Sequence, residues 1–258
     1  MPAPSNPLKA ALKRDEMQIG MWMGLRDRTV AEIAAGAGFD WCLIDGEHGP
    51  FDPVAIEAQL QVMKGHGAHP VVRVPAGETW MLKQMLDLGA QSILVPMVDT
   101  AEEAARLVRA VRYAPKGNRG MAAAVVRASD YNRELDYATN ADDEICLIVQ
   151  AESRAALSNI DAISAVDGVD CVFIGPADLS TDMGHGGAMH AEVMEAIEHM
   201  TARILAAGKA VGIISFDDDH LVRFAAAGIR FIGVGSDVFG LSSWMRELAR
   251  GAREKLSS

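Results

Sequence analysis

The sequence predicts an α/β fold, a (β/α)8 barrel in which residues 1–258 form one domain. Three observations predict this fold. Short apolar segments alternate with longer amphipathic segments, as is typical of βαβ units and a parallel sheet. There are eight such apolar segments, and 258 residues is the usual size of an eight-stranded barrel. An open doubly wound sheet remains the alternative, because periodicity does not show whether a sheet closes.

The predicted strands are short and rich in branched residues, which favour extended structure. They cover residues 18–24, 41–45, 70–74, 92–98, 145–152, 169–175, 210–215 and 231–235. The segments that follow them carry apolar residues at helical spacing. These predicted helices cover residues 29–38, 53–65, 79–90, 101–112, 153–166, 191–208, 217–228 and 236–255. Several end in a glycine just before the next strand, as in "LDLGAQS", where glycine terminates the helix.

One connection is far longer than the others. Residues 113–144 separate the fourth predicted helix from the fifth predicted strand. Connections of this length are commonly lids, binding loops or subunit contacts. We therefore expect this segment to have a role beyond joining two elements.

Composition limits the classes of partner. The formal charge of −11 argues against nucleic acid, whose binding proteins normally carry a basic stripe, and favours small metabolites. Cys42, Cys146 and Cys171 lie in apolar segments and are expected to be buried thiols in a reducing compartment. No apolar run approaches about 18 residues, and the first twenty residues lack a signal-peptide core. The expectation is a soluble cytoplasmic protein without membrane contact.

Polar residues gather where predicted strands end, which is where barrels build their active sites. In "LIDGEHGPFD", the second strand is followed by Asp45, Glu47 and His48. The other such residues are Arg73 at the third strand, Gln150 and Glu152 at the fifth, and Asp178 after the sixth.

Glu152 and Asp178 follow neighbouring strands, so their carboxylates can converge on one ion. Two oxygen ligands without histidine or cysteine suit a hard divalent cation such as Mg²⁺ or Mn²⁺. The remaining positions of the ion would accept substrate oxygens. The alternative is that both acids cap the helical turns that begin beside them.

Arg73 interrupts "PVVRVP", a strand otherwise fit for burial. A buried guanidinium must be paired or bind an anion, and its planar fork suits a carboxylate. It is therefore a candidate for substrate binding, with a structural ion pair as the alternative. His48 is a candidate base because acids lie beside it, although it is also compatible with an ordinary loop histidine.

Some chemistries are not supported. No lysine lies at the end of a predicted strand, so a Schiff-base mechanism is not expected. No P-loop or Rossmann fingerprint follows the first strand, so we expect no nucleotide cofactor. The segment "GVGSD" (233–237) fits either a phosphate cradle or a plain turn into the last helix.

Several motifs carry a resemblance to a known family. These are "GFDWCLIDGEHGP", "VVRVP", "LDLGAQSILVPMV", "VQAESRAALSNIDAISAVDGVDCVFIGPADLS" and "GVGSD". They resemble the HpcH/HpaI aldolase family of metal-dependent class II pyruvate aldolases, over about residues 17 to 240. The resemblance implies reversible cleavage of 4-hydroxy-2-oxo acids to pyruvate, or a related 2-oxo acid such as hydroxypyruvate, and an aldehyde.

The resemblance also implies roles for individual residues. Glu152 and Asp178 would hold the divalent metal, which could also be Co²⁺. His48 would be the proton acceptor, with Arg73 stabilising the transition state. The residues implied to bind the substrate are Gln150, Ala177, Asp178 and Arg73. The role implied for Asp87 is to raise the basicity of the histidine. The implied assembly is a homohexamer in which the C-terminal helix, about residues 236–255, packs on a neighbouring subunit.

The sequence departs from the family pattern at a few positions. In "MAAAVVRASDYN", alanines stand where relatives often carry small hydroxyl residues, and Asp130 stands where an aromatic or basic residue is common. Gly49 stands where alanine is frequent. These departures concern the aldehyde partner rather than the chemistry. Two alternatives remain, a citrate-lyase-like lyase acting on acyl-CoA and a non-catalytic oligomeric scaffold.

Overall fold

The computed structural model describes residues 2–257, which contain a closed barrel of eight parallel strands. Each strand pairs with the next one in the chain, and β8 pairs with β1. The barrel prediction is therefore confirmed, and the open-sheet alternative is wrong. The strands are β1 (Gln18–Met23), β2 (Trp41–Asp45), β3 (His69–Arg73), β4 (Ser92–Val95), β5 (Cys146–Ala151), β6 (Cys171–Ile174), β7 (Ala210–Ile214) and β8 (Phe231–Ser236).

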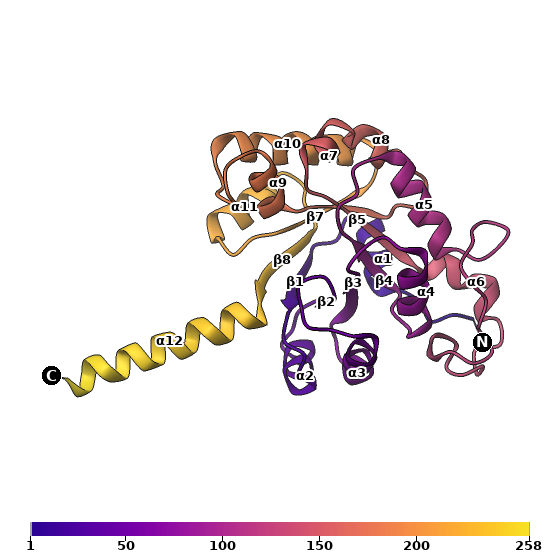
Figure 1. The fold of residues 1–258 in the computed structure, drawn as a ribbon, viewed down its shortest axis with the longest axis horizontal. Coiled ribbons are helices and arrows are strands. Elements are labelled where there is room, and N and C mark those ends of the chain that lie inside the picture. The colour runs from indigo at the N-terminus through magenta and orange to yellow at the C-terminus, as the bar shows by residue number, and fades with distance from the viewer. Residues whose placement is uncertain (1, 258) are drawn as a thin grey trace.

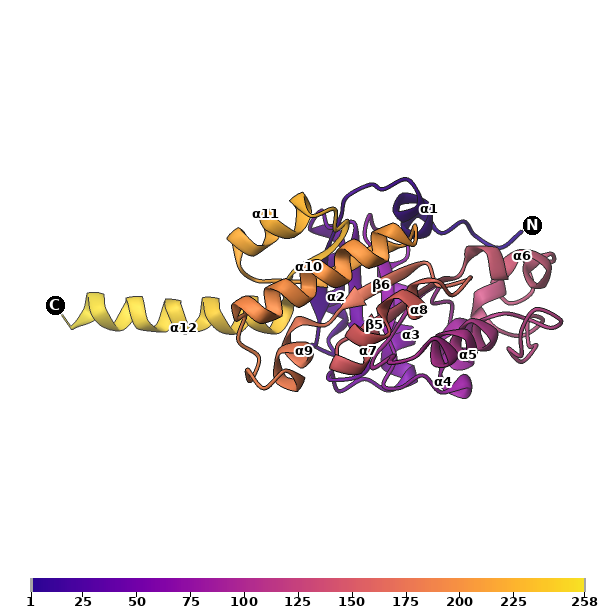
Figure 2. The ribbon, with the colours of Figure 1, turned by 90° about the horizontal axis from the view of Figure 1, so that it is seen from above.

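Most helices pack around the barrel, whereas α12 extends away from it, as Figures 1 and 2 show. They are α1 (Pro7–Lys13), α2 (Arg28–Gly36), α3 (Pro53–Met63), α4 (Thr79–Asp87), α5 (Ala101–Val111), α6 (Tyr137–Glu144), α7 (Arg154–Ser158), α8 (Ile160–Ser164), α9 (Pro176–Asp182), α10 (Ala191–Ala206), α11 (Asp218–Ala226) and α12 (Asp237–Leu256). Their starts follow local sequence. Thr100, for example, forms a capping box with Glu103 that satisfies free backbone N–H groups at the start of α5.

The core has two main layers. One cluster of buried aliphatic residues fills the space between the barrel and its helices. A second cluster fills the barrel, where Trp41 stacks on Phe231 with ring centroids 4.1 Å apart. Leu8 and Leu12 of α1 belong to this second cluster, so α1 packs against the barrel interior. Apolar burial on both sides of the strands explains why the strand segments are almost uniformly hydrophobic.

The structure corrects several predicted boundaries. The strand predicted over 92–98 ends at Val95, because Met97 adopts a left-handed backbone conformation (φ 54°) that an extended strand excludes. The helix predicted over 153–166 is two short helices, α7 and α8, which meet at Asn159. The side chain of Asn159 donates to the carbonyl of Asp99 (2.8 Å), which fixes the junction. Helices α1, α6 and α9 were not predicted.

The long connection before β5 contains the 3₁₀ turn η1 (Arg127–Ser129) and α6. It is held by Arg119, whose guanidinium carbon lies 4.4 Å from the ring centroid of Tyr113 and 5.8 Å from that of Tyr137. Arg119 also pairs with Asp87 (2.9 Å). This connection therefore packs on the barrel near the end of α4.

Helix α12 extends away from the barrel in both views (Figures 1 and 2). Its large apolar side chains are exposed, including Phe239, Trp244 and Leu248. Within residues 2–257, no helix combines the length and the apolar character needed to cross a membrane.

Candidate active site

The candidate residues meet at the carboxyl end of the barrel, because β2, β3 and β5 are parallel and all end there. Asp45 and Arg73 are register partners at the ends of β2 and β3. Gln150 lies near the end of β5. The N–H of Gly175, directly after β6, donates to the carbonyl of Ala151, the last residue of β5 (3.2 Å). Neighbouring strands thus place these side chains at one mouth of the barrel.

Arg73 is buried and held by two acids. Its Nε and Nη2 donate to the two carboxylate oxygens of Asp45 at 2.8 and 2.6 Å, and its Nη1 lies 2.7 Å from Oε2 of Glu47. Burial acts to raise the pKa of Asp45, but the hydrogen bonds and charge of Arg73 outweigh it and hold that pKa below its ordinary value. The ion-pair alternative is thus realised. Each Nη still carries a second N–H, so Arg73 keeps donors for a ligand.

His48 lies at the edge of this network. Its side chain is 67% exposed, and its Nε2 lies 3.7 Å from Oε2 of Glu47. The backbone N–H groups of Glu47 and His48 both approach Oδ1 of Asp45, at 3.1 and 3.3 Å, so the loop after β2 turns back onto the strand end. A solvent-facing imidazole beside a carboxylate is placed to exchange protons with a ligand at the mouth.

Glu152 is the most buried acid of the site, with 2% of the residue exposed. Its Oε1 accepts the backbone N–H of Met97 (2.9 Å), and its Oε2 accepts the side-chain amide of Gln150. Burial raises the pKa of Glu152 to about 7, and the nearby charges of Asp178 and Glu47 act in the same direction. The three carboxylates therefore lie within electrostatic reach of one another.

The capping alternative does not hold for Glu152. Helix α7 is capped by Ser153, whose hydroxyl accepts the N–H of Ala156 (2.9 Å). Asp178 is exposed in the first turn of α9, where the capping position is Gly175 and no side chain caps the helix. Neither acid is therefore used as a helix cap.

The donor set fits a divalent cation. Within residues 2–257, no group of three or more His, Cys, Asp and Glu side chains converges closely enough to be recognised as a metal site by itself. The acids Glu152 and Asp178 would supply two oxygen ligands and leave the other positions to water or substrate. Two observations fit such an ion. Within residues 2–257, Glu152 is buried beside other acids and pairs with no basic side chain, and Oε1 of Gln150 is buried without a hydrogen-bond partner. An incoming ligand would satisfy both.

Sequence reasoning missed two parts of the site. Gly175 is one, because a Cβ there would overlap Oε2 of Glu152 and lie 2.8 Å from Nε2 of Gln150. Met97 is the other, since its left-handed backbone directs its N–H to Glu152. The Gly-Pro pair in "FIGPADLS" was a local signal for the first, whereas nothing in the sequence marks Met97.

Two sequence-based candidates lie elsewhere or act differently. Asp87 ends α4, and helices of the barrel run opposite to the strands, so it lies towards the amino end of β4 and pairs with Arg119. Within residues 2–257, Asp87 and His48 make no contact with each other. That Asp87 raises the basicity of the histidine remains a prediction. In "GVGSD", Ser236 caps α12 and Asp237 accepts the N–H groups of residues 24 and 25. That segment is a turn with an inward carboxylate, which disfavours phosphate.

Comparison with known proteins gives consistent results. The family model HpcH/HpaI aldolase/citrate lyase matches residues 18–243. A hydroxypyruvate/pyruvate aldolase from Agrobacterium fabrum is 51% identical over 250 residues, which cover 96% of this chain and 94% of that protein. A 4-hydroxy-2-oxovalerate aldolase from Rhodococcus jostii is 49% identical over 251 residues, covering 96% of both chains. The crystal structure of an HpcH/HpaI aldolase/citrate lyase family protein from Burkholderia cenocepacia superposes with a TM-score of 0.91 at 38% identity, covering 98% of this chain and 100% of that one.

Proposed function

Because this chain belongs to the HpcH/HpaI aldolase/citrate lyase family and is an aldolase, we propose that it cleaves 4-hydroxy-2-oxo acids reversibly to a 2-oxo acid and an aldehyde, with a divalent metal ion. The proposed 2-oxo acid is pyruvate or hydroxypyruvate. Several relatives about half identical to this chain are named hydroxypyruvate/pyruvate aldolase. We further propose that residues 1–258 form one catalytic barrel domain.

One observation carries this proposal. The buried carboxylate of Glu152 lies within electrostatic reach of Asp178 and Glu47, at the same barrel mouth as the guanidinium of Arg73. Glu152 and Asp178 cap no helix and, within residues 2–257, pair with no basic side chain, so they suit an ion such as Mg²⁺, Mn²⁺ or Co²⁺. A divalent ion held by Glu152 and Asp178 would supply Lewis-acid polarisation of the oxygens of a 2-oxo acid.

The chain's own residues supply the rest. Arg73 is fixed by Asp45 and Glu47, so its remaining N–H groups are oriented before substrate binds. We assign to it the stabilisation of negative charge that develops on the substrate oxygen. A preorganised donor of this kind contributes roughly 3 kcal/mol to lowering the barrier.

His48 is assigned the proton transfer. In cleavage it removes the proton of the C4 hydroxyl at its imidazole nitrogen as the bond between C3 and C4 breaks. In the reverse direction it takes a proton from the methyl group of the 2-oxo acid. Its exposure and the neighbouring carboxylate of Glu47 suit a group that must bind and release protons in each turnover.

Gln150 and Ala177 are proposed to line the bound 2-oxo acid. Gln150 donates its amide to Glu152, which leaves its unpartnered Oε1 available to a hydroxyl of the ligand. Ala177 lies exposed beside Asp178 in the first turn of α9. A small side chain there leaves room above the carboxylates.

The acyl-CoA alternative is disfavoured. Relatives about half identical to this chain are named aldolases. The citrate lyase beta subunit from M. tuberculosis is only 17% identical, so its similarity supports a shared fold but not a shared reaction. The scaffold alternative is wrong, since the chain is an enzyme of the aldolase class.

We also propose the homohexamer and the cytoplasmic location expected from the sequence. The exposed apolar side chains of α12, such as Trp244 and Leu248, would be covered by a neighbouring subunit. A contact of Asp87 with a histidine would then join two copies, because one chain does not bring them together. The three free, buried cysteines are consistent with a reducing compartment.

The metal requirement is tested by Mn²⁺ titration and by aldol cleavage before and after EDTA treatment. Glu152→Gln removes the proposed ligand charge without changing the side-chain shape, and Glu195→Gln makes the same change on the exposed surface of α10. We expect Mn²⁺ affinity and cleavage to be lost in the first variant and retained in the second. Activity that survives exhaustive EDTA treatment would overturn the metal-dependent mechanism.

A further inference from the structure

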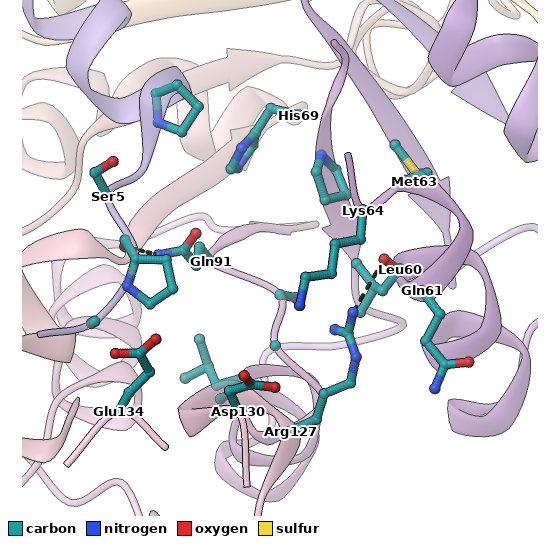
Figure 3. Close-up of a pocket in the computed structure, with 18 of the residues that line it drawn as sticks. Ser5, Leu60, Gln61, Met63, Lys64, His69, Gln91, Arg127, Asp130 and Glu134 are labelled. Carbon is teal, nitrogen blue, oxygen red and sulfur yellow. Dashed lines mark hydrogen bonds between the residues drawn. The ribbon is translucent and has the colours of Figure 1, made fainter. Parts of the chain in front are cut away.

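A cavity of about 580 Å³ lies at the end of the barrel opposite the active site. Its lining includes His69, which begins β3, and Gln91, which directly precedes β4 (Figure 3). Both therefore lie at the amino ends of the strands, whereas Glu152 and Arg73 lie at the carboxyl ends. The N-terminal segment near Ser5 and the long connection before β5 complete the walls. The volume suits a small organic molecule.

Two cations face this cavity without acid partners. Arg127 donates Nη1 to the carbonyl of Leu88 (2.7 Å) and Nη2 to that of Leu60 (3.3 Å), and within residues 2–257 it makes no ion pair. Three of its five N–H groups remain for a ligand. Lys64, at the end of α3, likewise has no ion-pair partner in the described chain. In Figure 3 both charged ends point into the cavity.

The other walls are polar and carry acids. Figure 3 places Ser5 and Glu134 across the cavity from Lys64, with Asp130 between Glu134 and Arg127. Asp130 also pairs with the exposed Arg133 at 3.2 Å. The cavity therefore offers positive charge on one side and hydrogen-bond acceptors on the other.

The wall formed by the long connection is held in an unusual conformation. Asp130, Tyr131 and Asn132 have positive φ angles of 48°, 54° and 69°. Left-handed geometry costs non-glycine residues roughly 1 to 2 kcal/mol each, so it persists only where contacts impose it. The buried hydroxyl of Ser129 supplies such contacts, because it accepts the N–H of Asn132 (3.1 Å) and donates to the carbonyl of Ala123 (2.5 Å). Asp130 and Tyr131 are thereby fixed at the cavity wall.

We propose that this cavity is a second binding site, for a small organic anion. Its carboxylate or phosphate group pairs with Lys64 and Arg127, and its hydroxyl or ammonium groups bond to the side of Asp130 and Glu134. A guanidinium and an ammonium without acid partners bind an oxyanion through charge-assisted hydrogen bonds. Such a ligand joins the N-terminal segment, the end of α3 and the long connection, so binding stabilises the folded chain.

The test uses the full chain and 3-phosphoglycerate, a probe that carries a carboxylate, a hydroxyl and a phosphate, with inorganic phosphate as a second probe. Binding is measured by calorimetry in the wild type, in Lys64→Met and in Lys116→Met. Lys116 is an exposed lysine that does not line the cavity, so its variant makes the same charge change elsewhere. Hydrogen exchange of residues 127–137 reports where the probe binds.

We expect 3-phosphoglycerate to bind and to slow amide exchange in residues 127–137. Lys64→Met should weaken binding about tenfold or more, the usual effect of losing one charge-assisted hydrogen bond. Lys116→Met should not change binding, and Lys64→Met should keep its aldolase activity without probe. Equal affinity in wild type and Lys64→Met would overturn the proposal, as would a failure of both probes to bind at millimolar concentration. Because binding is measured without turnover, these outcomes are independent of the proposed reaction.

Discussion

Replacing Gly175 with alanine tests how closely the site is packed around Glu152. The backbone φ of Gly175 is −87°, which any residue adopts, so the change adds a methyl group without backbone strain. That methyl group would overlap Oε2 of Glu152 and lie 2.8 Å from both Cβ of Glu152 and Nε2 of Gln150. Real Cβ contacts are essentially never closer than 3.0 Å, so the carboxylate must move.

The size of the effect follows from that displacement. The carboxylate must shift by roughly 1 Å, and a misplacement of this size commonly costs about a hundredfold in rate. Glu152 is also the proposed metal ligand, so Mn²⁺ affinity should fall together with the rate. We therefore expect kcat/KM for aldol cleavage to drop about a hundredfold, with weaker Mn²⁺ binding in a titration.

The control is Gly235→Ala near the end of β8, where an added Cβ meets nothing within 4 Å. That variant should keep wild-type activity and Mn²⁺ affinity. Denaturant unfolding of both variants separates a displaced carboxylate from a misfolded chain. If Gly175→Ala retains kcat/KM within a few fold and binds Mn²⁺ as the wild type does, Glu152 is not the metal ligand at this position.

Other changes give distinct results. Arg73→Ala should lower kcat about a hundredfold or more and destabilise the fold, because the buried Asp45 loses its partner; turnover within a few fold of wild type contradicts the assigned role. His48→Ala should slow deuterium exchange at the methyl group of pyruvate about a hundredfold, and an unchanged rate by NMR removes it from the mechanism. Burial lowers the pKa of His69 to about 4. Between pH 6.5 and 4, the imidazole of residue 69 therefore binds a proton in the unfolded chain but not in the folded one. The free energy of unfolding should fall by about 3 kcal/mol as the pH drops through this window. His69→Gln should remove that fall and His66→Gln, at an exposed position, should retain it; urea unfolding at several pH values decides between them.

Much of the candidate site could be predicted because strand ends are recognisable in the chain. The alternation of apolar and amphipathic segments identifies where each strand stops, and parallel strands in a barrel all stop at one mouth. Asp45, Arg73, Gln150 and Glu152 were selected by that rule, and the structure places them at that mouth. The rule needs only local sequence, since a strand end is a local event.

Functions of single side chains were less predictable. Sequence spacing allowed Glu152 to be a helix cap, but Ser153 takes that role, and the carboxylate of Glu152 instead accepts from Met97 and Gln150. Glu47 was only a supporting candidate, yet it holds Nη1 of Arg73. Asp87 was assigned to the histidine, whereas in the chain it binds Arg119. Each outcome depends on which side chains meet across the fold.

The sequence by itself determined the barrel, the positions of its strands and the acids and arginine at their ends, because hydrophobic periodicity and turn residues act over a few neighbouring positions. Tertiary structure alone decided that Gly175 makes room for Glu152, that Met97 donates to it, and that the segments near Ser5, Lys64 and Arg127 enclose a second cavity. These contacts join residues separated by 23 (Glu152 to Gly175) to 122 (Ser5 to Arg127) positions. They form only when the closed sheet brings remote loops together, and no local pattern encodes them.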